Sequence, residues 1–366
     1  MHKHHEKVTP LQLGTVIAST IIGVSILALP RFVVLEAGKG APLASLVGIT
    51  LVFIGLLGIV MLGRRFPEQT LIGYNQIILG KPFGSVISVL FIVYMTILLG
   101  LEARQFGEVI AGSLLTNTPI QIPIFIIIFL CAVSGLQNVS TFVYIHLLYI
   151  PLIVIPIILI IFPSLKDVAF YHLTPIVGHH PSVTKIVQGG LIAAQAISNV
   201  FIISMLIPSM KNPKKCIKSS IVGFWIGSIT VFIIVTMCLA VFGEEEIKEM
   251  FWPTLILGRM VNIPAELLSR VDAILLISWI YAVFTTLLSV YFFVIRGVAE
   301  LFRFERYRLL TLLIFPVVFA VALIPNDIFE MYEFLLYVTK YGLILTIGYP
   351  VFLWLIACLR RKREES

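Results

Sequence analysis

Ten long apolar segments, separated by short polar stretches, run along the chain. A membrane-spanning helix needs about 20 mostly apolar residues, because the hydrocarbon core of a bilayer is about 30 Å thick. We therefore predict an all-α polytopic membrane protein with ten transmembrane helices. The least obvious boundary is a tight turn near Gln137 and Asn138. The predicted spans are 11–30, 41–63, 84–113, 122–137, 139–162, 185–208, 216–243, 267–296, 308–324 and 333–358.

The ten predicted spans divide into five per half of the chain. An odd number of helices in each half gives the two halves opposite orientations in the membrane, which is the arrangement of an inverted repeat. We predict one transmembrane domain over residues 1–366, with repeat one at about 11–162 and repeat two at about 185–358.

The first and sixth spans carry small polar residues near their middles, at 20–25 and 195–200. Glycine weakens a helix, and short hydroxyl side chains bond to their own backbone. We expect both helices to be broken at the bilayer midplane, which leaves backbone groups free to bind a ligand. Close helix packing is the alternative explanation for these small residues. Interrupted spans at matching places in two halves favour the binding site of a transporter-like fold.

We predict a ligand pocket between the two breaks, with walls from the third and eighth spans. Packing against a neighbouring helix is the competing explanation for each wall position. Free amides suit a carboxylate and free carbonyls suit an ammonium group. Because no carboxylate or lysine lies at the middle of either broken span, we expect a small neutral ligand, with an apolar amino acid ahead of a sugar or nucleoside. The candidate ligand-binding residues are Thr20, Gly23, Val24, Ser25, Leu98, Leu99, Gly100, Ser198, Asn199, Val200, Tyr281, Phe284, Thr285 and Thr286.

Charged residues recur at one end of several spans. One explanation is an outer gate made of ion pairs, since residues four apart on a helix share a face. The other is ordinary snorkelling of charged side chains at the membrane interface. The candidate gate residues are Arg31, Glu102, Arg104, Glu108, Arg270, Asp272, Glu330 and Glu333.

Two ionisable residues lie deeper in their spans. Lys340 is about 10 Å into the tenth span at 1.5 Å per residue, and His146 is similarly deep in the fifth. Either could carry a proton in a symporter, although Lys340 could instead pair with a carboxylate and His146 could bond to a carbonyl. Ser289, with Thr285 and Thr286, could supply hydroxyls to a cation site. His146, Lys340 and Ser289 are therefore the possible coupling residues.

Composition agrees with a membrane protein. The chain is 59% hydrophobic and only 12% charged, whereas soluble domains average about 25% charged residues. Lysine and arginine are concentrated in alternate loops and at both ends, so the net charge of +7 indicates orientation rather than nucleic-acid binding. We predict that both termini are cytoplasmic.

Enzymatic chemistry is not expected. Cys131, Cys216, Cys238 and Cys358 have no metal-ligand or redox spacing. The sequence has no phosphate-binding loop, zinc motif or nucleophile-and-base pattern. We predict no cofactor and no metal.

Three stretches point to a known family. Residues 23–31 read Gly-Val-Ser-Ile-Leu-Ala-Leu-Pro-Arg, Arg65-Phe66-Pro67 is followed by Gly80-Lys81, and Ile207-Pro208 is followed by a lysine-rich stretch at 211–215. With these motifs the chain resembles, over almost its whole length, the B subunit of spore germinant receptors. These endospore germination permeases are a family within the amino acid–polyamine–cation transporter superfamily.

The resemblance implies a five-plus-five fold, with the first and sixth spans broken around an amino-acid-sized pocket. It also implies a complex with an A subunit and a lipoprotein C subunit in the spore inner membrane. Two functions follow: a receptor that binds a small germinant and signals to partner subunits, or a proton- or sodium-coupled amino acid symporter. We favour the receptor on the resemblance alone.

Overall fold

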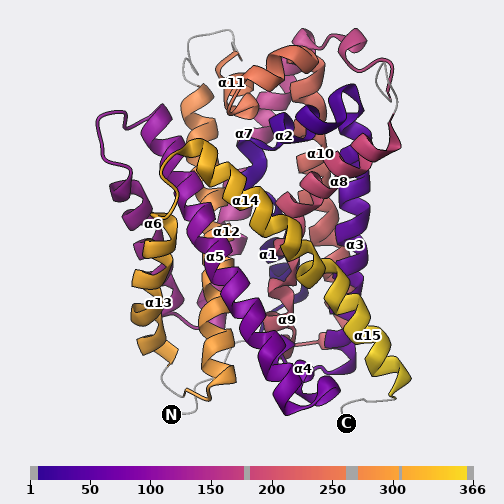
Figure 1. Ribbon diagram of the computed structural model, residues 1–366, viewed down its shortest axis with the longest axis vertical. Helices are drawn as coiled ribbons and strands as arrows, with labels where there is room; N and C mark the ends of the chain where they lie inside the picture. The colour runs from indigo at the N-terminus through magenta and orange to yellow at the C-terminus, as the bar shows by residue number, and fades with distance from the viewer. Residues whose placement is uncertain (1–6, 177–181, 261–270, 305–306, 361–366) are drawn as a thin grey trace.

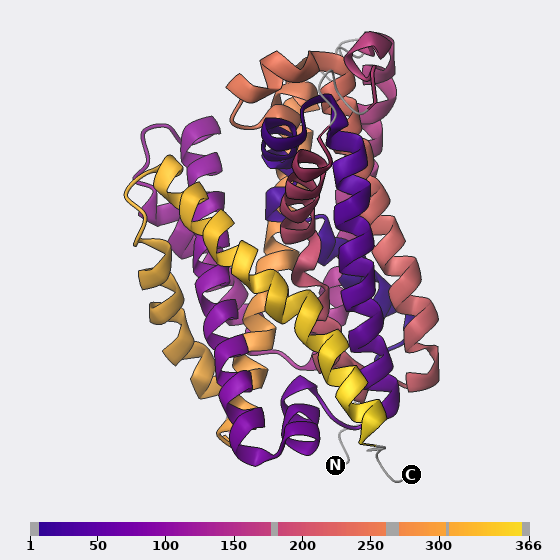
Figure 2. The same ribbon diagram turned by 45° about the vertical axis from the view of Figure 1, so that its right-hand side comes forward.

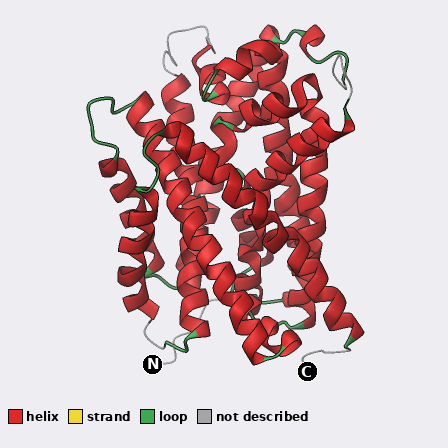
Figure 3. Cartoon of the chain, viewed as in Figure 1, coloured by secondary structure: helices red, strands yellow, loops and turns green. Residues whose placement is uncertain are grey.

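The structure is a computed structural model that describes residues 7–176, 182–260, 271–304 and 307–360, without the side chains of 271, 272 and 307. The described chain is built from helices (Figure 3). In chain order they are α1 (Pro10–Ile21), α2 (Leu29–Ala37), α3 (Ala41–Arg65), α4 (Leu71–Leu79), α5 (Lys81–Ser113), α6 (Gln121–Gly135), α7 (Val139–Ser164), α8 (Val183–Ile197), α9 (Ile203–Leu206), α10 (Cys216–Glu249), α11 (Pro253–Met260), α12 (Val271–Leu301), α13 (Tyr307–Ala322), α14 (Ile328–Leu343) and α15 (Tyr349–Leu359).

Most of these helices run along the long axis of the molecule (Figure 1). Within the described residues, seven helical stretches are long and apolar enough to cross a membrane. Three shorter apolar helices, α1, α6 and α13, accompany them. The protein is therefore a multi-span membrane protein, and each predicted span overlaps one or more of these helices within the described residues. The predicted turn after α6 is also present, with Asn138 capping the start of α7.

Both predicted helix breaks are present. α1 ends at Ile21, and a 3₁₀ turn over Val24–Leu27 separates it from α2. Pro30, which has no backbone N–H to donate, lies in the first turn of α2, where none is required. α8 ends at Ile197 and passes through a 3₁₀ segment, Ser198–Ile202, into the short helix α9. The small and polar residues at mid-span thus interrupt the helices rather than only packing them together.

Small residues bring α3 and α8 into close contact. A Cβ atom added to Gly48 of α3 would lie only 2.7 Å from the Cβ of Ala193 and 2.8 Å from the backbone nitrogen of Ala194. A Cβ on Gly189 would similarly meet the Cβ atoms of Ala37 and Ala44. Close backbone approach through Gly and Ala is a usual way for membrane helices to associate. This contact places α8 beside α2 and α3.

α1 begins and α15 ends at the same end of the bundle, which we call the terminal end (Figure 1). At this end Val8 pairs with the chain after α9, donating to Ser209 and accepting from Lys211, both at 2.9 Å. α4 also lies there (Figure 1). The opposite, distal end carries α11 (Figure 1). α10 bends near that end at Gly243, whose φ of 78° favours glycine.

α14 and α15 form one long, inclined helix across the face of the bundle (Figure 2). Between them, Ile344–Gly348 is a π-helical segment. α15 packs on α3, where Gly58 leaves room for the backbone at Pro350, and Tyr349 donates to Oδ1 of Asn75 at 2.7 Å. α14 instead packs against α5 and α8. The two parts of this helix thus contact different parts of the bundle.

Candidate functional site

A cavity lies on the distal side of the two helix breaks. It contains about 450 Å³ of atom-free space, including the opening to solvent. Four parts of the bundle line it: the start of α2 with the turn before it, α5, α8 and α14. The lining residues are Ser25, Ala28, Leu29, Phe32, Glu102, Gln105, Ile192, Gln195, Ala196, Tyr332, Leu335, Leu336 and Thr339. A largely apolar pocket with a few convergent polar groups is the usual form of a small-molecule site.

Glu102 of α5 is the charged residue among these lining side chains. It is only 5% exposed, and its Oε1 accepts a hydrogen bond of 2.9 Å from Nδ2 of Asn199. Asn199 lies in the 3₁₀ break after α8, so this bond connects α5 to the second interrupted helix. The cavity therefore contains a buried carboxylate, which comes from α5 and not from either interrupted helix. Glu102, a candidate gate residue by sequence, thus lines the central cavity.

Tyr332 of α14 joins three elements at the rim of the cavity. Its hydroxyl oxygen accepts from Nε1 of Trp252 at 3.2 Å and from Nε2 of Gln105 at 3.5 Å. Its ring lies 4.8 Å from the ring of Phe32 in α2. Deeper in α14, the hydroxyl of Thr339 donates to Oε1 of Gln195 in α8 at 2.8 Å. These contacts hold the cavity-lining face of α14 in position.

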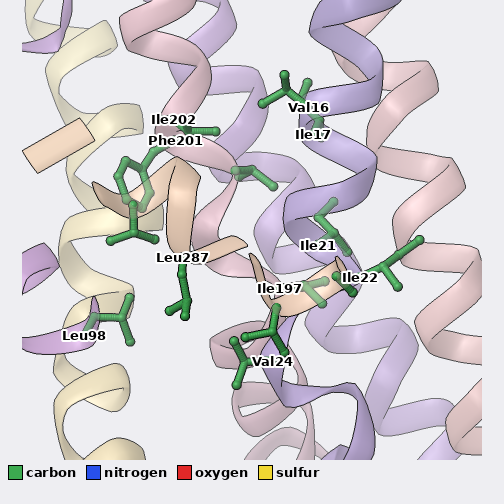
Figure 4. Packing of buried hydrophobic residues seen from close by; sticks show 14 of the residues in the cluster. Val16, Ile17, Ile21, Ile22, Val24, Leu98, Ile197, Phe201, Ile202 and Leu287 are labelled. Atoms are coloured by element: carbon green, nitrogen blue, oxygen red, sulfur yellow. The ribbon is translucent and has the colours of Figure 1, made fainter. Parts of the chain in front are cut away.

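Of the predicted ligand-binding residues, Ser25 lines the cavity and Asn199 contacts Glu102. Around the breaks, apolar side chains pack together, and Figure 4 shows Ile22 and Val24 near Ile197. Tyr281 and Phe284 pack against Tyr149 of α7, with ring centroids 5.0 and 5.8 Å apart. The predicted positions that are buried in the protein without lining the cavity are Thr20, Val24, Leu98, Leu99, Ser198, Val200, Thr285 and Thr286.

Two predicted glycines face helices rather than the cavity. A Cβ on Gly23 would collide with the side chain of Thr286 in α12. A Cβ on Gly100 would lie 2.7 Å from the Cβ of Val321 in α13. Both glycines therefore permit close helix approach.

A second polar cluster lies on the terminal side of the first break. Nδ1 of His146 is 2.6 Å from the hydroxyl of Ser19, and its Nε2 is 3.3 Å from the hydroxyl of Ser289. Ser289 is also 2.9 Å from the hydroxyl of Thr20. Thr286 donates to the carbonyl of Thr20 at 3.3 Å, which brings a second α12 hydroxyl to the cluster. All of these side chains are at most 1% exposed, so α1, α7 and α12 share a buried hydrogen-bonded network.

Of the possible coupling residues, the structure thus brings His146 and Ser289 together. Lys340 does not join them, because its side chain is exposed on α14. No group of three or more His, Cys, Asp or Glu side chains suited to a metal ion occurs among the described residues.

The predicted gate residues do not all meet. Arg104 pairs with Glu108 at 2.8 Å and reaches the carbonyl of Asn326, which ties α5 to the loop before α14. Arg31 donates to the carbonyl of Lys248 at 3.1 Å and lies over the ring of Phe251.

The other predicted gate residues have separate environments. Glu330 accepts from the backbone and side chain of Asn326, and Glu333 is exposed. Arg270 and the side chain of Asp272 lie outside the described residues.

Several cavity residues were missed by sequence reasoning. Gln105 follows Glu102 by one helical turn, so the two share a face of α5. Tyr332, Leu336 and Thr339 are spaced by four and three residues and form one face of α14. This spacing is present in the sequence, but only the structure identifies which face of each helix meets the cavity.

The chain matches the family described as "Spore germination protein" over residues 7–331. It is 25% identical to spore germination protein YndE of Bacillus subtilis, covering 98% of both chains. It is also 25% identical to spore germination protein B2 of the same organism, over 99% of this chain and 98% of that one. Spore germination protein GerLB of Bacillus cereus is 23% identical over 88% of this chain and 87% of its own.

The fold is similar to a solved structure of a different kind. A Na⁺-coupled sialic acid symporter, in a substrate-bound outward-open state, superposes with a TM-score of 0.67. The match covers 94% of this chain and 82% of the symporter at 10% identity. This likeness concerns the fold alone, and it indicates a transporter-type architecture.

Proposed function

Because the chain belongs to the spore germination protein family, we propose that it is the ligand-binding membrane subunit of a germinant receptor. In this proposal a small neutral nutrient, and an amino acid first, binds in the central cavity, and the subunit signals to its partners. The observation that supports it most is the cavity itself, where two interrupted helices meet α5 and α14 around a few buried polar groups. Such a site can couple binding to movement of the elements around it, provided the ligand binds one arrangement more tightly than another.

The proposed architecture is a single transmembrane domain of ten helices in a five-plus-five inverted repeat. The fold similarity to a transporter and the two interrupted helices, one in each half, support it. In this arrangement α1 with α2 forms the first span, and α8 with α9 forms the sixth.

The proposed location is the spore inner membrane, with both termini in the cytoplasm. The concentration of lysine and arginine near the terminal end supports this orientation. Family membership also supports assembly with a receptor A subunit and a lipoprotein C subunit.

Germination of spores that carry this protein with its partner subunits as their only nutrient receptor tests the proposal. A panel of amino acids, sugars and nucleosides is added, and germination is followed by loss of optical density. We expect alanine, valine, leucine or proline to act ahead of glucose or inosine, because apolar side chains line most of the cavity. Germination by glucose alone would contradict the proposed ligand class.

A proton- or sodium-coupled amino acid symporter is the second candidate. The likeness to a Na⁺-coupled symporter favours it, and the buried His146 network offers polar groups beside the first break. Uptake of labelled amino acids into proteoliposomes containing this chain alone separates the two functions. Accumulation driven by an ion gradient would establish the symporter, whereas saturable binding without accumulation is the result expected of the receptor.

A further inference from the structure

Three buried oxygen atoms beside the cavity have no hydrogen-bond partner among the described residues. They are Oε2 of Glu102, Oε1 of Gln105 and Oδ1 of Asn199. The three side chains are each at most 5% exposed. Buried polar atoms are normally hydrogen-bonded, so each unpaired atom needs an explanation.

All three unpaired atoms are acceptors. The orientation of Asn199 follows from Glu102, since a carboxylate oxygen requires a donor and only the amide nitrogen of Asn199 can supply one at 2.9 Å. The amide nitrogen of Gln105 is directed to the hydroxyl of Tyr332. The site therefore has unused acceptors, and what it needs from a ligand is hydrogen-bond donors.

Glu102 also lacks a cationic partner in the described part of the chain. The basic residue nearest to it in α5, Arg104, is paired with Glu108. Lys248, another basic residue near the distal end, pairs with Glu244 and Glu245. A buried charge without a partner is unfavourable, and a bound cation would remove that penalty.

We propose that Glu102, with Gln105 and Asn199, is the recognition site for a protonated amine on the ligand of the central cavity. An ammonium group carries three N–H donors and no acceptor, and a positive charge that matches the carboxylate. Ala28, Leu29 and Leu335 of the same cavity suit a small apolar group attached to that amine. This inference rests on the proposed function and gives it a chemical requirement: an amino acid binds through its amino group, and its hydroxy-acid analogue does not.

The experiment uses the full chain in lipid nanodiscs and measures the shift of the thermal unfolding midpoint on adding a compound. The probes are alanine, valine and leucine, the matching hydroxy acids lactate, 2-hydroxyisovalerate and 2-hydroxyisocaproate, the simple amine isobutylamine, and glucose and inosine. Glu102→Gln removes the charge and keeps an oxygen to accept from Asn199. Glu333→Gln is the matched control, because Glu333 is exposed on α14.

We expect at least one amine-bearing compound to stabilise the wild-type protein and its hydroxy analogue to have no effect. In Glu102→Gln the apparent affinity for that compound should fall roughly 10- to 100-fold, the contribution of a hydrogen-bonded charge. Glu333→Gln should bind as the wild type does. Equal binding of an amino acid to Glu102→Gln, or of a hydroxy acid to the wild type, would overturn the inference while leaving nutrient binding in place.

A panel in which only glucose or inosine binds would overturn both the inference and the proposed amino-acid ligand. The thermal unfolding midpoint of the protein without any added compound supplies a second test. Removing an unpaired buried charge should leave this midpoint unchanged or raise it. A lower midpoint in Glu102→Gln would mean that the carboxylate already has a cationic partner in the protein, and the inference would fail.

Discussion

Tyr332 links the rim of the cavity to two other elements through a single hydroxyl group. Changing Tyr332→Phe keeps the ring against Phe32. It leaves the buried side-chain amide of Gln105 and the N–H of Trp252 without their acceptor. We expect a loss of about 1–3 kcal/mol in stability, the usual penalty for an unsatisfied buried donor. Thermal unfolding in nanodiscs measures it. Tyr337→Phe on the exposed side of α14 is the control, and an equal effect of the two changes would rule out a special role for the Tyr332 hydroxyl.

Gly23 allows the first break to lie directly against α12. In Gly23→Ala the added methyl group would collide with Thr286, so we expect the break to move away from α12 and nutrient response to weaken. An overpacked contact of this kind usually costs about 1–3 kcal/mol. The check is a germination dose response normalised to the amount of protein in the membrane.

Thr286 also supplies the control for Gly23. The double variant with Thr286→Ala removes the two side-chain atoms that the new methyl group would meet first. It should recover part of the lost response. If the double variant responds to nutrient no better than Gly23→Ala does, the contact with α12 is not the reason for glycine at this position.

The candidate site was only partly predictable from single residues. Counting along the chain gives the depth of Glu102 in its helix but not the direction in which it points. α5 is apolar on nearly all sides, so its sequence does not indicate which face meets the cavity. The structure directs Glu102 and Gln105 to the cavity and Gly100 to α13. Only the positions of the neighbouring helices settle this choice.

The positions and breaks of the helices were more predictable than the side of each helix that faces the cavity. The breaks in α1 and α8 follow from Gly23, Ser25, Ser198 and Asn199, residues that weaken a helix where no water can replace its hydrogen bonds. The π-helical segment was not predicted. Its sequence, Ile-Leu-Thr-Ile-Gly, is as apolar as the rest of the span, and nothing in it marks the place where the segment lies against Gly55 of α3.

A substitution that adds one methyl group tests whether the close contact between α3 and α8 stabilises the protein. In Gly48→Ala the new Cβ would meet the backbone of α8, which cannot rotate away as a side chain can. We expect the unfolding free energy to fall by about 1–3 kcal/mol and the yield of folded protein to fall with it. Gly348→Ala is the matched control, because nothing lies within 4 Å of a Cβ added there. A Gly48→Ala protein with the unfolding free energy of the wild type would mean that the close contact at Gly48 is not needed for stability.

At the scale of the whole molecule, the predicted orientation in the membrane can be tested by labelling. Lys166 and Lys214 are both exposed and lie in loops that we predict on opposite sides of the membrane. Lys166→Cys should react with a membrane-impermeant maleimide added outside intact cells, and Lys214→Cys only after the membrane is opened. Cys131, Cys216 and Cys238 are buried, so replacing Cys358 is enough to lower the background. The reverse labelling pattern would place the termini outside.

The π-helical segment between α14 and α15 makes the long helix tolerant of losing one residue at that point. A π-bulge holds one residue more than the same turn of a regular α-helix, in which each residue turns the chain by about 100°. Deleting Leu345 should therefore leave a regular helix in which Tyr349 still faces Asn75 and Pro350 still faces Gly58. The same deletion in the regular helix α5 would instead turn every later residue of that helix by about 100°.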